Sequence, residues 1–205
     1  MFDAPQASRK KSGIGKKVVL YAVGGTVPKF PGATKVIMEC IGAGGRGYGD
    51  ADPPASGQGG GGGAYAKRTM SLAGITNLYL SVSGGGSMTT VRAETSIGTT
   101  LCAAEYGAGG SADTPGAGGS AAGNTLGDVK FAGGTGGSRG GGGAAGPDGP
   151  GGNAAGSTGG ASGGAPAGAG GNTAANGGNY GGGSGGNSGG YPGNAANGFI
   201  RLTWM

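Results

Sequence analysis

Residues 133–152, GGTGGSRGGGGAAGPDGPGG, place a glycine at every third position from Gly134 to Gly152. About half of the residues from there to Gly198 are glycine, most others are Ala, Ser, Thr or Asn, and the only charges are Arg139 and Asp148. Glycine makes up 60 of the 205 residues, so almost a third of the chain has no side chain to bury. Any apolar core is therefore small and local.

A glycine at every third residue is the period of an extended, left-handed, three-residue helix. The phase slips beyond Gly152, as in NAAGST and ASGGAPAG, exclude a long collagen rod. We therefore expect a body of short, packed polyglycine II helices, in which the missing Cβ atoms let neighbouring backbones exchange hydrogen bonds. A flexible low-complexity linker has the same composition and stays open as the alternative.

Short strand-like runs fill the chain before this tract. From Val18 to Leu101, β-branched and aromatic residues alternate with polar ones between glycine turns, which predicts strands and essentially no α-helix. In the run KVIMECI, we expect Val36, Met38 and Cys40 to face the core and the opposite face, which carries Glu39, to be the more exposed one.

The chain closes with FIRLTWM at 199–205, in which every second residue is large and apolar. This pattern predicts a strand that returns to the first half of the chain for its partners. The predicted fold is all-β or irregular, with a small sandwich-like antiparallel β base and a glycine-rich body. Its parts are a basic arm at 1–17, the base with glycine loops at 18–132, the polyglycine II body at 133–198 and the closing strand at 199–205.

Positive charge is concentrated at the N-terminus. Residues 1–17 hold five of the 14 basic residues and one of the nine acidic ones. The stretch QASRKKSGIGKK has no interleaved aromatic residues, which argues against nucleic-acid binding and favours docking on an acidic partner surface. The docking candidates are Phe2, Arg9, Lys10, Lys11, Lys16 and Lys17.

Two further features concern the cellular compartment. No apolar run is long enough to span a membrane, and no signal-peptide core follows the N-terminal charges, so we expect synthesis in the cytoplasm and no membrane span. Cys40 and Cys102 each lie in an apolar stretch, which favours two free buried thiols and leaves a single disulfide as the alternative.

Residue types that support catalysis are missing or scattered. The chain has no histidine, and its one close carboxylate pair, Asp50 and Asp52, lies on a Gly/Pro-rich loop. Gly42, Gly44 and Gly47 match a dinucleotide-binding spacing, but the prolines and glycines that follow prevent the helix which that site requires. We therefore expect no enzymatic activity, no metal and no cofactor.

Tyrosines on glycine-rich loops are the candidates for contact with a ligand. Adaptable recognition loops are enriched in Tyr, Asn, Ser and Gly. We expect Tyr48, Tyr180 and Tyr191 to be exposed, and Tyr65 and Tyr106 to pack on the base or against the edges of the body.

Several blocks in fixed order resemble a known family. They are FPGATKVIMECIGAGGRG at 30–47, GQGGGGGAYAKRTMSLAGITNLYLSVSGGG at 57–86, the glycine tract and the last strand. Over about residues 18–205, this order resembles the glycine-rich domain of bacteriophage tail-fibre proteins. It is also similar to the distal adhesins of T-even phage long tail fibres, in which layers of polyglycine II helices carry variable loops that contact outer-membrane receptors.

The resemblance implies a virion protein made in the bacterial host, with turns around 153–158, 172–176 and 191–197 facing a receptor. The implied partners are other virion proteins of the fibre, tail or capsid, and a host surface glycan or outer-membrane protein. A homotrimer stays open, because phage fibres are often trimeric. The receptor-contact candidates are Tyr48, Asn153, Asn172, Asn176, Tyr180, Tyr191 and Asn194.

One departure from the adhesins is that only the basic arm precedes the glycine body here, whereas the adhesins have a sizeable attachment region. The position in the virion therefore stays open between a tail fibre, a head fibre and a decoration protein. The alternatives to a receptor-binding fibre are a capsid or tail decoration or assembly protein without a receptor, and an ice-binding polyglycine II protein.

Overall fold

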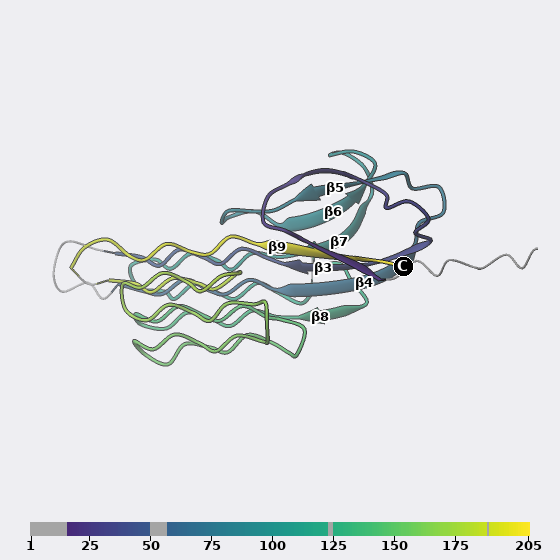
Figure 1. Cartoon of the computed structure of the whole chain (residues 1–205). Helices are drawn as coiled ribbons and strands as arrows, with labels where there is room; N and C mark the ends of the chain where they lie inside the picture. The colour runs from purple at the N-terminus through teal and green to yellow at the C-terminus, as the bar shows by residue number, and fades with distance from the viewer. Residues whose placement is uncertain (1–15, 50–56, 123–124, 188) are drawn as a thin grey trace, which may run out of the picture.

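The computed structural model describes residues 16–49, 57–122, 125–187 and 189–205. A β base lies at one end of an elongated molecule, and extended glycine-rich segments run side by side from it (Figure 1). The described part of the chain contains no helix, and so none that could cross a membrane. The predicted all-β class and antiparallel base are confirmed.

Two antiparallel sheets form the base. The first has the strand order β1-β9-β3-β4-β8 and the second β2-β5-β6-β7. In the first sheet the strands are β1 (Lys17–Tyr21), β9 (Phe199–Trp204), β3 (Lys35–Ile41), β4 (Tyr65–Ser71) and β8 (Val129–Phe131). In the second they are β2 (Gly25–Pro28), β5 (Asn77–Ser81), β6 (Thr89–Ala93) and β7 (Thr100–Ala104).

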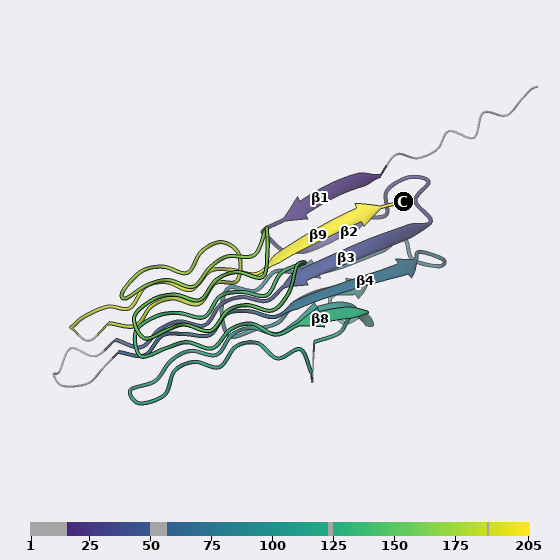
Figure 2. The ribbon, with the colours of Figure 1, turned by 90° about the horizontal axis from the view of Figure 1, so that it is seen from below.

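The last strand of the chain is central in its sheet, between β1 and β3 (Figure 2). Its register on β3 pairs Cys40 with Ile200 and Val36 with Trp204. The two halves of the chain are therefore joined by a full antiparallel ladder, and the glycine tract both leaves and re-enters the base.

The core lies between the two sheets. The side chains of Val36, Met38 and Cys40 are fully buried there, as predicted. They pack with residues of β9 on their own sheet and with the inward residues of the second sheet, which include Leu78, Leu80, Val91 and Cys102.

Both cysteines are free and buried in this core, so the disulfide alternative is excluded. The Cys102 thiol donates weakly to the carbonyl oxygens of Met38 and Ala66, each at 3.8 Å. Hydrogen bonding to Cys102 together with burial raises the pKa of the Cys40 thiol well above its ordinary value.

The expectation that the Glu39 face of β3 is the more exposed one was wrong for Glu39 and Ile41, which are 6 % and 1 % exposed. Turns of the glycine body fold back over this end of the sheet and cover it. A second cluster forms there, with Ile41, Tyr65, Ala144, Ala145, Ala167 and Phe199 buried and Phe131 and Tyr180 packed against them. We call this cluster the junction.

Glu39 is buried as a charge with two partners. Arg201, opposite it across β3 and β9, donates from Nε to Oε2 at 2.5 Å and from Nη2 to Oε1 at 2.6 Å, and the Tyr65 hydroxyl donates to Oε1 at 2.6 Å. Burial alone raises the pKa of this carboxyl, but the hydrogen bonds from Arg201 and Tyr65 outweigh it and hold the pKa below its ordinary value. Burial and the bond to Glu39 raise the pKa of Tyr65.

The body consists of extended segments that run out from the base, turn and return (Figures 1 and 2). Residues 59–64 lie at its centre, and their amides donate to three neighbouring segments with a period of three residues. Gly59 and Gly62 donate to Gly137 and Gly134, Gly60 and Gly63 to Ser184 and Gly181, and Gly61 and Ala64 to Ala108 and Glu105.

The same central segment accepts hydrogen bonds from three further segments. The donors include Gly45, Gly116 and Gly142, whose acceptors are the carbonyls of Gly61, Gly59 and Gly60. Residues 59–64 are thus hydrogen-bonded on all sides to neighbouring backbone segments. The hydrogen-bonded assembly includes residues 42–48, 57–64 and 105–119 as well as the later tract, so it begins before the boundary at Gly133 that composition suggested.

The segments of the body can pack this closely because glycine has no side chain. A Cβ atom on Gly61 or Gly63 would lie 2.0 Å from the carbonyl oxygen of Ala117 or Gly42, respectively. Real Cβ atoms do not approach backbone oxygens so closely, so the five consecutive glycines of 59–63 follow from the packing of this segment against neighbours on every side.

Candidate recognition surface

Among the described residues, five turns lie at the end of the body away from the base (Figure 1), and we call them the distal turns: residues 111–114, 138–139, 155–158, 173–175 and 186–191 apart from 188. Four of them are joined to one another by backbone hydrogen bonds. Arg139 donates to Gly156 at 3.0 Å, Thr173 to Ser157 at 3.1 Å, Ala174 to Gly186 at 3.0 Å, and Gly186 to Arg139 at 2.8 Å. These turns are therefore held relative to one another and do not move as separate loops.

Three of the predicted receptor contacts use their side-chain oxygens inside the body. Asn153 Oδ1 accepts from the amide of Thr135 at 2.9 Å, Asn172 Oδ1 from Gly159 at 2.8 Å, and Asn176 Oδ1 from Asn194 at 2.8 Å. All three residues are exposed, and their side-chain oxygens hold a neighbouring segment. Their first role is structural.

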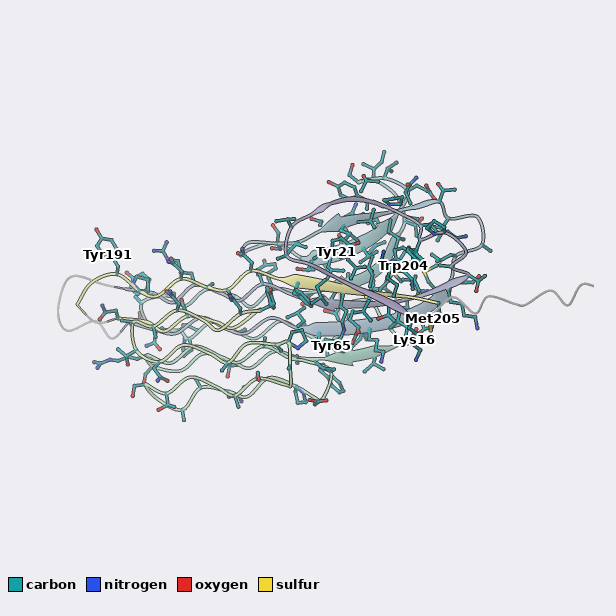
Figure 3. The ribbon with its side chains drawn as sticks, viewed as in Figure 1. Lys16, Tyr21, Tyr65, Tyr191, Trp204 and Met205 are labelled. Atoms are coloured by element: carbon teal, nitrogen blue, oxygen red, sulfur yellow. The ribbon has the colours of Figure 1, made fainter. Side chains whose placement is uncertain are left out.

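The predicted tyrosines lie at different places. Tyr191 is 90 % exposed on the distal turns, as predicted (Figure 3). Tyr48 was predicted to be exposed but is half-buried beside them, where its carbonyl accepts from the amide of Asn187 at 3.1 Å. Tyr180 was predicted to be exposed but is half-buried at the junction, where its ring stacks on Phe199 with centroids 4.4 Å apart. Tyr180 therefore lies at the opposite end of the body from Tyr191.

The other two tyrosines also differ from each other. Tyr65 is buried on the base, as predicted. Tyr106, which was predicted to pack, is 38 % exposed on the side of the body. The reason is its position just after β7, where the chain leaves the sheet and begins an outer segment of the body.

Tyr106 stands between two hollows on this side of the molecule. The first, which we call the side groove, has a volume of about 340 Å³ and lies between the β5–β6 loop and the body. Its lining includes Arg46, Tyr106, Asn194, Asn197 and the backbone of Gly84–Gly86. The second has a volume of about 300 Å³ and is lined by residues that include Met88, Glu105 and Ser120.

Of the residues that line the side groove, only Asn194 was among the predicted contact residues. Arg46, Asn194 and Asn197 come from segments that are about 150 residues apart in the chain but adjacent in the body. The one local signal was the SGGGS loop at 83–87, whose glycines have no side chains to fill the space above the body.

Of the six docking candidates, Phe2, Arg9, Lys10 and Lys11 lie outside the described residues. Lys16 and Met205 lie at the base end of the molecule, opposite Tyr191 (Figure 3). Lys17 is the first residue of β1, and its Nζ lies 4.4 Å from the centroid of the Phe30 ring.

The glycines of the dinucleotide-like motif are part of the body. The amide of Gly44 donates to Ala196 and that of Gly47 to the hydroxyl of Ser184, and the described segment continues as extended chain without a helix. These amides are therefore occupied by protein partners and do not form a phosphate cradle.

No protein-family model matches this chain, and no curated protein matches it.

Proposed function

We propose that this chain is a bacteriophage virion protein, a tail fibre or fibre-tip adhesin, that binds a host cell-surface receptor through a glycine-rich scaffold. The observation that carries the proposal is the polarity of the molecule. The described ends of the chain, Lys16 and Met205, lie at the base, and the distal turns with Tyr191 lie at the far end of the body (Figure 3). Such a protein can attach to a phage particle through its base and expose its distal turns to the surface of a host cell.

We further assign the body to polyglycine II helices. Amides three residues apart donate to the same neighbour, and the central segment has hydrogen-bonded neighbours on all sides. A three-residue extended helix has these three faces, whereas a β-strand has only two hydrogen-bonding edges. This geometry favours a stiff body and supports the proposal that the distal turns are held at a fixed distance from the particle.

The distal turns supply suitable chemistry for recognition. The exposed Tyr191 offers a large amphipathic surface at low entropic cost, and the exposed residues Asn153, Asn172 and Asn176 lie within two residues of the distal turns in sequence. Because the asparagine oxygens and the turn backbones are already bonded within the protein, little ordering remains to oppose binding.

A competition experiment tests the receptor role. The purified full chain, added at saturating concentration, should block adsorption of the parent phage, and Tyr191→Ala should weaken the block without changing the melting temperature. Failure of the wild-type chain to block adsorption would leave the decoration or assembly role. Thermal hysteresis in the same preparation would instead support an ice-binding role.

A further inference from the structure

We propose that the side groove binds an acidic saccharide, a pyranose that carries a carboxylate or a phosphate. The inference deepens the proposed function, because it assigns a ligand class and a second contact surface to the same protein. The groove lies along the side of the body and not at its distal turns. Its cavity of about 340 Å³ is within the range of small-molecule sites.

An exposed aromatic ring forms one wall. Tyr106 lines both the side groove and the hollow next to it, and it is 38 % exposed. An aromatic ring exposed in this way can cover the apolar C–H face of a sugar, while its hydroxyl remains available for a polar contact. A buried ring of the core offers neither.

The charge in the groove selects the kind of sugar. Arg46 is the one charged residue in its lining, it is exposed, and its guanidinium has no partner among the residues that the structure describes. A guanidinium presents a planar fork that matches a carboxylate or a phosphate. The amides of Asn194 and Asn197 add donors and acceptors for hydroxyl groups.

The remaining wall is backbone. Gly84, Gly85 and Gly86 carry no side chains, and the last two have φ of +75° and +71°, a conformation that glycine adopts without strain. A sugar ring can therefore approach the peptide groups of this loop closely.

The opposite side of the groove is fixed by the body. The carbonyl of Arg46 accepts from Gly110, the amide of Gly107 donates to Ala43, and the carbonyl of Asn197 accepts from Gly181, each at 2.9 Å. Arg46, Tyr106 and Asn197 are thus mounted on hydrogen-bonded backbone, so the site is formed before a ligand arrives.

Amide chemical-shift titration of the ¹⁵N-labelled full chain tests the proposal with four probes: glucuronate, glucose 6-phosphate, glucose and inorganic phosphate. We expect shifts at Arg46, Gly84–Gly86 and Gly107, and an affinity for at least one acidic sugar about tenfold above that for glucose, as one charged hydrogen bond provides. The preferred acid distinguishes a carboxylate ligand from a phosphate ligand.

Two variants test the contributions of the Arg46 charge and the Tyr106 ring separately. Arg46→Gln should remove the preference for the acidic sugar over glucose. Tyr106→Ala should lower the affinity for glucose and for the acidic sugar by about tenfold, and it should leave the affinity for inorganic phosphate unchanged. Lys130→Gln on β8 and Ile97→Ala, changes at exposed side chains outside both the groove and the distal turns, are the controls and should bind as the wild type does. Unchanged shifts at the base confirm that each variant is folded.

The proposal is overturned if neither acidic sugar shifts the groove amides, or if inorganic phosphate binds as well as the phosphosugar and Tyr106→Ala has no effect. Its failure is distinct from that of the proposed function. A chain that blocks adsorption but binds no acidic sugar retains the receptor role at the distal turns alone. A chain that binds the sugar but does not block adsorption retains the groove and loses the adhesin role.

Discussion

A Cβ atom on Gly62 would lie 2.0 Å from the carbonyl oxygen of Gly143, a residue 81 positions further along the chain. The neighbouring atom is backbone, so no side chain can rotate away to make room. Gly62 also donates its amide to Gly134 at 2.8 Å. Adding one methyl group here therefore requires two segments to separate and their hydrogen bonds to lengthen.

Gly62→Ala should destabilise the chain by about 3 kcal/mol or more, since overpacking and lost backbone hydrogen bonds add together. Gly189→Ala is the control, because a Cβ there meets nothing within 4 Å, and it should change the stability by less than about 0.5 kcal/mol. Denaturant unfolding followed by circular dichroism measures both. Equal stability of the two variants would refute the close packing at Gly62.

The ion pair of Glu39 predicts a pH dependence. Because the pKa of Glu39 is held below its ordinary value of 4.5, the pair contributes stability that is fully present above that pH. The contribution is lost as the pH falls through the lower, folded-state pKa. Wild-type stability should therefore fall below about pH 4.5, and Glu39→Gln should flatten the profile in this window.

At neutral pH, Glu39→Gln should cost about 1–2 kcal/mol, less than for a fully buried pair because the Arg201 side chain is 30 % exposed. Asp113→Asn, a change at an exposed turn carboxylate, serves as the control and should follow the wild-type profile. Unfolding free energies measured between pH 3 and pH 7 would count against the ion pair if Glu39→Gln and wild type ran parallel throughout.

Asn172, which directly precedes the distal turn at 173–175, should contribute to stability as well as to recognition. Asn172→Ala removes the acceptor of the Gly159 amide and should cost about 1 kcal/mol, whereas Asn172→Asp keeps an acceptor oxygen and should cost less. Thermal unfolding compares the two. Indistinguishable melting temperatures for Asn172→Ala and wild type would show that the side-chain oxygen does not hold the turn.

The two core thiols should be inert in the folded state. Burial and the raised pKa of Cys40 leave little thiolate at pH 8, so a thiol-specific reagent should react only as the protein unfolds. Two thiols should then be released per chain in denaturant. Rapid labelling of the native protein, or no labelling after unfolding, would contradict two free buried cysteines.

The periodicity of the sequence predicted those features of the fold that depend only on nearby residues, such as which side chains of a strand face the core. The two-residue alternation around Val36, Met38 and Cys40 was sufficient to predict which side chains fill the core. It could not predict that Glu39 is buried, because the turns that cover its face come from a part of the chain more than 100 residues away.

The tyrosines illustrate the same limit for the candidate site. Tyr106 and Tyr180 both lie among glycines, yet one is exposed beside a groove and the other is stacked at the junction. Which end of the body a turn occupies depends on how many segments precede it and how long each one is. Composition carries no information on that count, so the exposure of each ring was not predictable from its neighbours.

Amide hydrogen exchange of the full chain in solution tests the central claim, that the glycine-rich body is ordered by hydrogen bonds of its own backbone. We expect the amides of Gly142, Gly143 and Gly183, which donate within the body, to be protected to a degree comparable with the amides of β3. Exchange of these glycine amides at the rate of an unstructured peptide, while β3 stays protected, would contradict it.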